Sequence, residues 1–410
     1  MHVAARCMRG GEVLVVYLDH AATTPLRPVA RDAWLAAAQE VGNASSVHGA
    51  GQAARRLLEE SRERIAAILD CQPIEVVFTS GGTESINLAI KGLWWARPGG
   101  TDGSDARAAI VLPDGEHHAT LDTVGWLATQ GAEVRAVPLD GLGRIDAGAF
   151  AAALPGAALA TALVVNNEVG TVQDAAALSS ASAAAGVPLH LDAVGAVGHL
   201  PVSFSGWRAD ATGPTGLVAL SLSGHKFGAP VGTGALVVSR HATLIPGLHG
   251  GGQQRGLRSG TPDVAGAAAL AAALAEAEAE RLDEQTRLGA LTARLAEGIR
   301  SAVPAARILG DLVERVPGNV HALFPGAAGE SLLFLLDRAG ISVSTGSACQ
   351  AGIAEPSHVV MALGFDERAA RSVLRFTLGR TSTEADVDAV LAALPDAYAR
   401  ASGSRTATRP

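Results

Sequence analysis

A lysine next to a long apolar run is the first feature of this sequence that suggests covalent chemistry. Lys226 follows the segment 218–222 (Val-Ala-Leu-Ser-Leu) and lies between Gly224 and Gly228. Burying an ammonium group is costly unless the amine is neutralised or used chemically. One such use is a Schiff base with the carbonyl group of a cofactor. The alternative is that Lys226 extends from the end of a strand to water.

Asp192 and a glycine-rich turn provide two further groups that suit a cofactor site. Asp192 follows the apolar segment 189–191, and a carboxylate at a buried strand end needs a cationic or hydrogen-bonding partner. A protonated pyridine nitrogen is such a partner, although a helix cap is an alternative role. Ser-Gly-Gly-Thr at 80–83 lies between a predicted strand and a predicted helix. Backbone N–H groups and the Thr83 hydroxyl would bind an anion there, unless the segment is an ordinary capped turn.

Polar side chains also follow two other apolar segments, and an arginine interrupts a third. His117 comes shortly after 109–112, where an imidazole can stack on an aromatic ring, transfer protons or have a structural role only. Asn167 belongs to a pair of amides that follows 162–165. Arg375 stands within an alternating strand pattern, and an inward guanidinium there would need a carboxylate from the protein or from a ligand.

The three cysteines are too few for a disulfide framework, and one of them is a candidate nucleophile. Cys349 lies in the segment 344–352, which consists mainly of small residues and resembles an accessible loop. We assign no role to Cys7 or Cys71. The segment 250–261 combines glycines, two arginines and two hydroxyl residues, which suits an anion-binding or subunit-contact loop, or a surface turn.

Together these groups indicate one cofactor. A lysine for an aldehyde, an aspartate for a ring nitrogen, a glycine-rich turn for a phosphate and an arginine for a carboxylate fit pyridoxal 5'-phosphate acting on an amino acid. Cys349 would add a sulfur acceptor.

The segments that would position these groups alternate between strand and helix patterns. Short apolar runs predict strands, and the longer segments between them predict helices at 86–95, 119–130 and 175–185. We expect an α/β fold with a mostly parallel sheet between helices, in which ligands gather where strands end. The strands are predicted at 76–78, 109–112, 134–139, 162–165, 189–191, 218–222 and 235–238.

The composition changes after residue 252, which predicts a second domain. An alanine- and glutamate-rich helix is expected at 264–303, followed by a smaller α+β domain. That domain should contain strands near 320–323 and 372–377 and helices at 330–339 and 384–394. We therefore expect an N-terminal extension (1–14), a large cofactor-binding domain (15–262), a linking helix with a small domain (263–400) and a disordered tail (401–410).

Composition also limits the partners. The 410 residues are 48% hydrophobic and carry a net charge of -8, which argues against nucleic acid as a partner. No apolar run is long enough to span a bilayer, and the N-terminus lacks a signal-peptide pattern. We expect a soluble cytoplasmic protein without a membrane partner.

Seven ordered motifs run through most of the chain. They are Tyr-Leu-Asp-His-Ala-Ala-Thr-Thr-Pro (17–25), Phe-Thr-Ser-Gly-Gly-Thr-Glu-Ser (78–85), Val-Asn-Asn-Glu-Val-Gly (165–170), Ser-Gly-His-Lys (223–226), Arg-Gly-Leu-Arg-Ser-Gly-Thr (255–261), Gly-Ser-Ala-Cys (346–349) and Arg-Phe-Thr-Leu-Gly-Arg (375–380). On these motifs the sequence from about Tyr17 to Leu394 resembles the cysteine desulfurases of group I, the NifS- and IscS-like branch of the class V aminotransferases. The spacing from Cys349 to Ser357 is similar to the long loop of that group.

The resemblance implies a fold-type I, pyridoxal-phosphate-dependent homodimer with a seven-stranded sheet, which converts L-cysteine to L-alanine. By the same resemblance Lys226 holds the cofactor, His117 stacks on its ring and Asp192 pairs with the pyridine nitrogen. Cys349 would take the sulfur as a persulfide and pass it to an acceptor protein, such as an iron–sulfur scaffold or a thiolation enzyme. The remaining implied ligands are Gly82, Thr83, Ser223 and His225 for the cofactor, Thr261 from the other subunit, and Asn167 and Arg375 for the substrate carboxylate.

Three positions depart from the pattern of the family. Gly195 stands where a glutamine usually contacts the cofactor's phenolic oxygen, His20 replaces an asparagine, and 211–216 is a short insertion. The alternatives are a selenocysteine lyase or a cysteine C–S lyase on the same scaffold. A weakly active sulfur-carrier subunit is a third alternative, which Gly195 alone favours.

Overall fold

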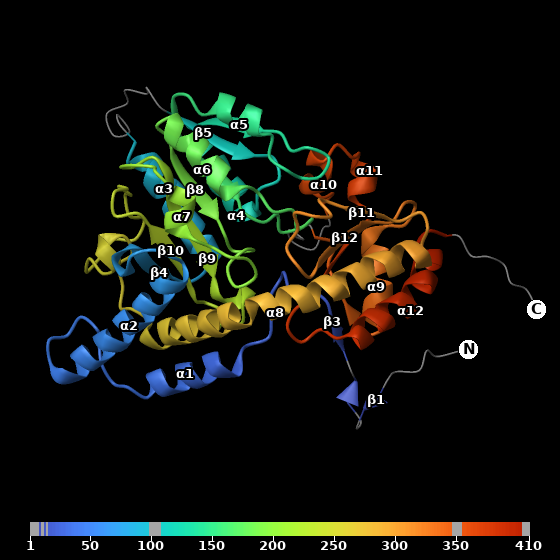
Figure 1. Ribbon diagram of the computed structural model, residues 1–410, viewed down its shortest axis with the longest axis horizontal. Coiled ribbons are helices and arrows are strands. Elements are labelled where there is room, and N and C mark those ends of the chain that lie inside the picture. The colour runs from blue at the N-terminus through green and yellow to red at the C-terminus, as the bar shows by residue number, and fades with distance from the viewer. Residues whose placement is uncertain (1–7, 10–11, 14, 98–107, 347–354, 404–410) are drawn as a thin grey trace, which may run out of the picture.

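The computed structural model describes residues 8–9, 12–13, 15–97, 108–346 and 355–403. Cys7 and Cys349 lie outside these ranges. A seven-stranded sheet forms the centre of the larger part of the molecule (Figure 1), as expected. Its spatial order is β4 (Val76–Thr79), β10 (Gly234–Val238), β9 (Gly216–Ser223), β8 (Pro188–Asp192), β7 (Ala157–Leu163), β5 (Ala109–Pro113) and β6 (Glu133–Val137).

The sheet is mostly parallel, because only β10 runs antiparallel to its neighbours β4 and β9. Successive side chains of a strand point to opposite faces, and β10 follows this rule. Leu236 and Val238 pack into one apolar core, whereas Ala235 and Val237 pack into the other. The continuous apolar runs predicted as strands are therefore buried on both sides.

Helices cover both faces of the sheet. On one face lie α3 (Gly82–Trp95) and α4 (His118–Ala128). The other core takes side chains from α2 (Gly49–Ile68), α5 (Ala147–Ala153), α6 (Ala175–Ala184) and α7 (Phe204–Arg208). Three of these elements differ from the sequence expectation. The strand β7 begins five residues before 162, because buried alanines form it, and the short helices α5 and α7 were not predicted.

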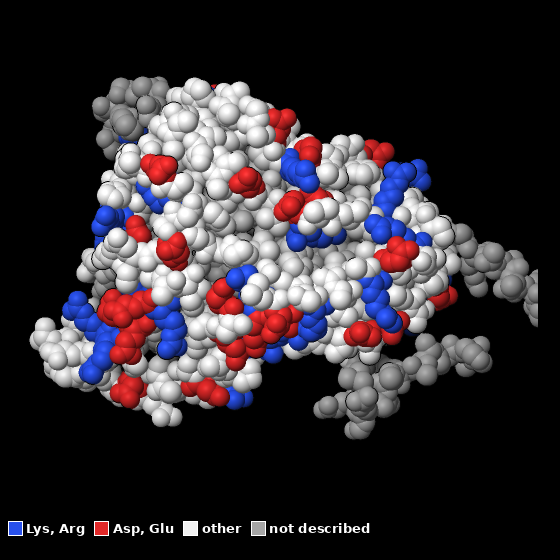
Figure 2. Space-filling view, in the orientation of Figure 1, with Lys and Arg blue, Asp and Glu red and all other residues white. Residues whose placement is uncertain are grey.

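The long helix α8 (Val264–Ala302) connects the two parts of the molecule (Figure 1), as the sequence predicted. Leu270 and Leu274 in its first half pack into the core of the large sheet. Leu291 and Leu295 in its second half pack into a separate core. Glutamates and arginines three residues apart form ion pairs along this helix. Figure 2 shows acidic and basic side chains close together on the face of the molecule that it draws.

The C-terminal part is built around a three-stranded antiparallel sheet of β11 (Arg307–Leu309), β12 (Asn319–Leu323) and β14 (Val373–Thr377). The helix α12 runs to Ala401, past Pro395 and beyond the predicted end at Leu394. The other helices here are α9 (Gly329–Arg338), α10 (His358–Ala362) and α11 (Glu367–Ala370).

The N-terminal segment belongs spatially to both parts. Its strand β3 (Val16–Tyr17) pairs in parallel with β13 (Ile341–Ser342), and Leu18 is buried in the C-terminal core. The chain then crosses to the large part, where α1 (Pro28–Ala38) packs on α8. The remaining elements are the two-residue strands β1 (Met8–Arg9) and β2 (Glu12–Val13) and the 3-10 helices η1 (Pro73–Glu75), η2 (Gly224–Lys226) and η3 (Gln254–Gly256). The exact domain borders predicted from the sequence stay a prediction.

Candidate active site

A cavity of about 580 Å³ lies where the strands of the large sheet end and the C-terminal part begins. Its wall includes nine of the eleven residues that the sequence singled out. Thr261 is exposed and lies outside this wall, and Cys349 lies outside the described residues. The nine are Gly82, Thr83, His117, Asn167, Asp192, Ser223, His225, Lys226 and Arg375.

Lys226 enters the cavity from η2, directly after the buried strand β9. Its Nζ donates hydrogen bonds to the carbonyl oxygens of Ala21 at 2.5 Å and Ala22 at 3.1 Å. Burial, helped by the nearby Arg375 cation, lowers the pKa of Lys226 to about 8, although Asp192 opposes this effect. A substantial fraction of the amine is therefore neutral, and nucleophilic, close to physiological pH.

Asp192 is buried at the end of β8, where its Oδ1 accepts a hydrogen bond from the Val194 N–H at 2.9 Å. Burial raises its pKa to about 6, while the Val194 N–H and the Lys226 cation act in the opposite direction. A buried carboxylate of this kind is stabilised by a cationic partner in the cavity. The alternative that Asp192 caps a helix is wrong, since no helix follows it in this described region.

His117 precedes α4 and caps that helix. Its Nδ1 accepts a hydrogen bond from the Ala119 N–H at 3.1 Å, so the ring proton of the neutral side chain lies on Nε2. Burial, followed by the charge of Lys226, lowers the pKa of His117 to about 4. The imidazole is therefore neutral at physiological pH, which suits stacking on an aromatic ring.

The start of α3 forms an anion cradle. Among the described residues no side chain caps this helix, so its first N–H groups are available to a ligand. Gly81 has φ +143, and a Cβ at Gly82 would lie 2.8 Å from Val194 Cγ2. Both glycines thus keep the approach to the helix open, and Ser223 and His225 line the same cavity.

Arg375 reaches the cavity from β14 of the small sheet. Its Nη1 donates to the Asn167 carbonyl oxygen at 2.7 Å, and its Nη2 pairs with Asp19 Oδ1 at 3.0 Å. Its Nε and the side-chain oxygen Oδ1 of Asn167 are buried without a hydrogen-bond partner in the described structure. Buried polar atoms that lack partners are costly, and a substrate carboxylate would satisfy the guanidinium.

Sequence reasoning assigned no role to Asp19, Glu168 or Ser357, although each belongs to a segment that it had noted. Glu168 is buried in the cavity wall, and its Oε2 accepts a hydrogen bond from Ser357 Oγ at 2.5 Å. A Cβ at Gly346 would lie 3.1 Å from that Glu168 oxygen. Glu168 thus joins two segments that lie close to Cys349 in the sequence, a contact that only the fold could reveal.

Two positions that depart from the family pattern also line the cavity. Gly195 lies in the wall, where an added Cβ would be crowded at 3.3 Å from Val165 Cβ. His20 is buried and its Nδ1 lies 2.7 Å from Thr24 Oγ1. The segment 211–216 forms a turn whose carbonyls at Ala211 and Gly213 accept hydrogen bonds from Arg208.

The fold and the cavity identify the class of this protein. Residues 16–390 match the aminotransferase class-V family, and the chain therefore belongs to that family. An IscS-like cysteine desulfurase from Mycobacterium tuberculosis is 48% identical over 395 residues, which make up 94% of this chain and 97% of that protein.

Solved structures that are similar to this chain support the same family. A NifS-like protein has a TM-score of 0.84 at 30% identity and covers 93% of this chain and 99% of its own. SspA, solved in complex with cysteine, has a TM-score of 0.74 at 29% identity and covers 88% of this chain and 98% of its own. Within the class-V family, the chain therefore groups with the NifS- and IscS-like cysteine desulfurases.

Pyridoxal phosphate is the cofactor of this family, and the residues of the cavity fit it. The lysine suits its aldehyde, the buried Asp192 suits its ring nitrogen, and the open start of α3 suits its phosphate. Among the described residues no group of side chains could hold a metal ion, and no helix is both long and apolar enough to cross a membrane.

Proposed function

We propose that this chain is a cysteine desulfurase that converts L-cysteine to L-alanine and passes the sulfur to Cys349 as a persulfide. The observation that supports the proposal most is that Lys226, Asp192 and Arg375 line one cavity. Asp192 ends a strand of the large sheet, Lys226 follows another strand of that sheet, and Arg375 belongs to the small sheet. Pyridoxal phosphate that acts on an amino acid needs these three groups together. The amine reacts with the cofactor's aldehyde, the carboxylate pairs with its ring nitrogen, and the guanidinium binds the carboxylate of the amino acid.

Six groups besides Lys226 would hold the cofactor. The N–H groups at Gly82 and Thr83 and the side chains of Ser223 and His225 would bind its phosphate. Asp192 would keep a proton on the ring nitrogen, and the neutral imidazole of His117 would cover the ring. When bound, the cofactor supplies a conjugated cationic ring that withdraws electron density from the Cα of the substrate.

Two residues would orient the substrate. The guanidinium of Arg375 and the amide N–H of Asn167 would donate to the carboxylate of L-cysteine, which would give the buried Arg375 Nε a partner. Lys226 would accept and return the proton of Cα at its Nζ. Its lowered pKa of about 8 suits both directions of that transfer near physiological pH.

Cys349 would accept the sulfur atom of the substrate. Its thiolate would attack the sulfur of the substrate while the Cβ–S bond breaks. The electron pair of that bond goes to Cβ, which then takes a proton, so the carbon product is alanine and the sulfur stays on Cys349. A protein such as an iron–sulfur scaffold or a thiolation enzyme would then accept this sulfur, and we infer a cytoplasmic location for this exchange.

Product analysis tests the reaction class. The purified protein with pyridoxal phosphate should produce alanine from L-cysteine, without pyruvate. Pyruvate as the main product would replace the proposal by a cysteine C–S lyase. Turnover of L-selenocysteine without turnover of L-cysteine would favour a selenocysteine lyase, and neither turnover would favour a sulfur-carrier subunit.

We also propose that the protein acts as a homodimer in which each Thr261 binds the cofactor of the partner. The exposure of Thr261, and its place outside the cavity of its own chain, support this idea. The test mixes an inactive Lys226→Ala chain with a Thr261→Val chain. If Thr261 acts on the partner, the mixed dimer has one site that combines an intact Lys226 with an intact Thr261, and activity should return at that site. Activity no higher than the sum of the two variants measured separately would contradict the exchange.

A further inference from the structure

The turn that carries Lys226 is held by an unusually complete set of hydrogen bonds from outside the turn. Four consecutive carbonyl oxygens, from His225 to Gly228, each have an external partner. The His225 oxygen accepts from the Thr24 N–H at 3.1 Å, and the Lys226 oxygen lies 3.2 Å from His199 Nε2. The last two oxygens both accept hydrogen bonds from Arg27.

Arg27 contacts this turn with its backbone and its side chain. Its backbone N–H donates to the Gly228 oxygen at 2.9 Å, and its Nε donates to the Phe227 oxygen at 2.9 Å. Gly228 has φ +93, and a Cβ at this position would lie 2.7 Å from Arg27 Cγ. The glycine therefore permits the aliphatic stem of Arg27 to lie against the turn.

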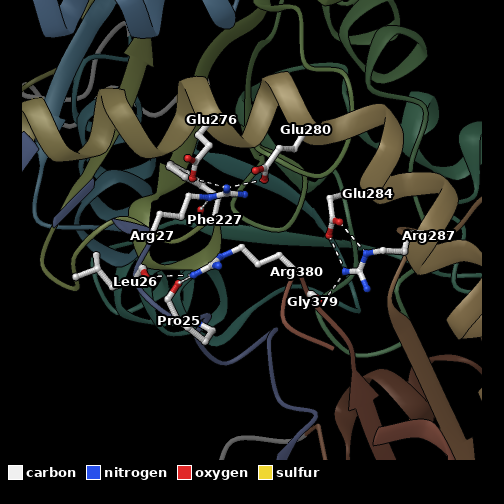
Figure 3. A network of polar contacts seen from close by, with 10 residues as sticks. All are labelled: Pro25, Leu26, Arg27, Phe227, Glu276, Glu280, Glu284, Arg287, Gly379 and Arg380. Carbon is white, nitrogen blue, oxygen red and sulfur yellow. Dashed lines mark hydrogen bonds and ion pairs between the residues drawn. The ribbon is translucent and has the colours of Figure 1, made fainter. Parts of the chain in front are cut away.

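The other end of Arg27 is fixed by the helix α8. Its Nη1 pairs with Glu276 at 2.8 Å and with Glu280 at 2.7 Å, and 7% of its side chain is exposed. Figure 3 shows the guanidinium between these two carboxylates and the Phe227 carbonyl. Because a guanidinium is planar and rigid, fixing one edge on α8 also fixes the direction of its Nε–H.

We infer that Arg27 is a positioning residue for Lys226: it orients the lysine turn by holding the Phe227 carbonyl from a fixed point on α8. This hydrogen bond holds the peptide between Phe227 and Gly228, one residue after Lys226, in a fixed orientation. Reacting groups are effective only when they are held in a narrow range of orientations. The inference rests on the proposed role of Lys226.

Lysine could not replace Arg27 in this role. An ammonium group could pair with Glu276 and Glu280, but it lacks a second donor at the place of Nε. Arg27→Lys should therefore keep the connection to α8 and lose the connection to Phe227. This difference separates positioning of the turn from a general contribution to stability.

Arg281 provides a matched control on the same helix. Its Nε pairs with Glu278 at 2.9 Å, and 13% of its side chain is exposed. Arg281→Met therefore removes an ion pair of similar burial that does not touch the lysine turn. Melting temperatures of all variants measure the loss of stability separately.

The test measures the reactivity of Lys226 itself. The full-length protein, with and without pyridoxal phosphate, is treated with an acetylating reagent over a series of pH values. Mass spectrometry then gives the pH of half-maximal reaction at Lys226. A second, independent measurement is the rate at which bound pyridoxal phosphate dissociates from each variant. An excess of a cofactor-free protein that binds pyridoxal phosphate traps the released cofactor.

We expect Arg27→Met and Arg27→Lys to raise the pH of half-maximal acetylation of Lys226 by about one pH unit, because a loosened turn lets the amine reach water. Both should also release the cofactor at least tenfold faster than the wild type, while Arg281→Met leaves both values unchanged. The inference would be overturned if Arg27→Lys had the same acetylation pH and cofactor release rate as the wild type. It would also be overturned if Arg281→Met changed both quantities as much as the Arg27 variants do. Because the acetylation arm works without cofactor, it decides the role of Arg27 even if the proposed function fails.

Discussion

Asp19 and Arg375 form an ion pair in which Asp19 Oδ1 lies 3.0 Å from Arg375 Nη2. The arginine belongs to the small sheet, and the aspartate belongs to the segment that continues to the carbonyls bound by Lys226. The pair therefore connects the proposed carboxylate site with the proposed reactive amine. Its members are 356 positions apart in the sequence, so the contact depends on the fold alone.

Asp19→Asn should weaken substrate binding and change the lysine at the same time. Arg375 would lose a charged hydrogen bond worth about 1.5–3 kcal/mol, so we expect KM for L-cysteine to rise roughly tenfold. Because Asp19 raises the pKa of Lys226, the pH of half-maximal acetylation should fall. Asp32→Asn, which removes an exposed ion pair with Arg31, is the control and should change neither value.

The anion cradle at α3 predicts a selective loss of cofactor. In Gly82→Ala the new Cβ would meet Val194 Cγ2 at 2.8 Å and Ser223 Cβ at 3.4 Å. We expect pyridoxal phosphate to bind at least tenfold more weakly, measured by the visible absorption of the bound cofactor. Gly125→Ala, where a Cβ meets nothing within 4 Å, should bind it normally. Equal affinity in both variants would contradict the proposed cradle.

A buried carboxyl beside the site predicts a pH-dependent stability. Burial raises the pKa of Glu116 to about 8, although the Leu163 N–H bound to its Oε1 opposes this change. The folded protein thus keeps a proton that the unfolded chain, with the ordinary glutamate pKa of 4.5, has already released. The stabilisation is complete below pH 4.5 and is lost as the pH rises through 8, about 5 kcal/mol in total.

Glu116→Gln should remove this dependence, because an amide can keep the hydrogen bond from Leu163 without ionising. Chemical unfolding at pH 5 and pH 9 provides the measurement. We expect the variant to gain stability relative to the wild type at the higher pH. A constant difference between the two proteins at both pH values would show that folding does not raise the pKa of Glu116.

The contact between Ser357 and Glu168 predicts a role for a hydroxyl group. Ser357 Oγ donates to Glu168 and also accepts from the Val360 N–H at 3.0 Å, which caps α10. Ser357→Ala should cost about 1–3 kcal/mol of unfolding free energy. Ser357→Thr keeps the hydroxyl and should cost less. A harmless alanine variant would show that neither hydrogen bond contributes to stability.

The sequence was sufficient to predict nine of the residues that the structure brings together in the cavity wall. Asp192, Lys226 and Asn167 follow buried apolar runs, and such runs end at the same edge of a parallel sheet. The motifs also indicated a common cofactor before any geometry was available. The long helix α8 was predictable because its alanine- and glutamate-rich composition continues for 39 residues.

Other contacts could not be predicted, because they depend on tertiary packing. Nothing in the local sequence of Arg27 indicates that it reaches Phe227, which lies 200 positions away. The early start of β7 was missed because alanine favours helices, and burial between neighbouring strands overrides that preference. The pKa values of Lys226 and Asp192 likewise depend on burial, which only the fold determines.

The most direct test of this account follows the sulfur atom. The protein with bound pyridoxal phosphate is incubated with L-cysteine, and the peptide that contains Cys349 is weighed by mass spectrometry while alanine is quantified. We predict that the peptide gains one sulfur atom as alanine forms, and that Cys349→Ala binds the cofactor normally but forms no alanine. Undiminished alanine production by Cys349→Ala, or alanine without added sulfur on Cys349, would contradict the proposed sulfur transfer.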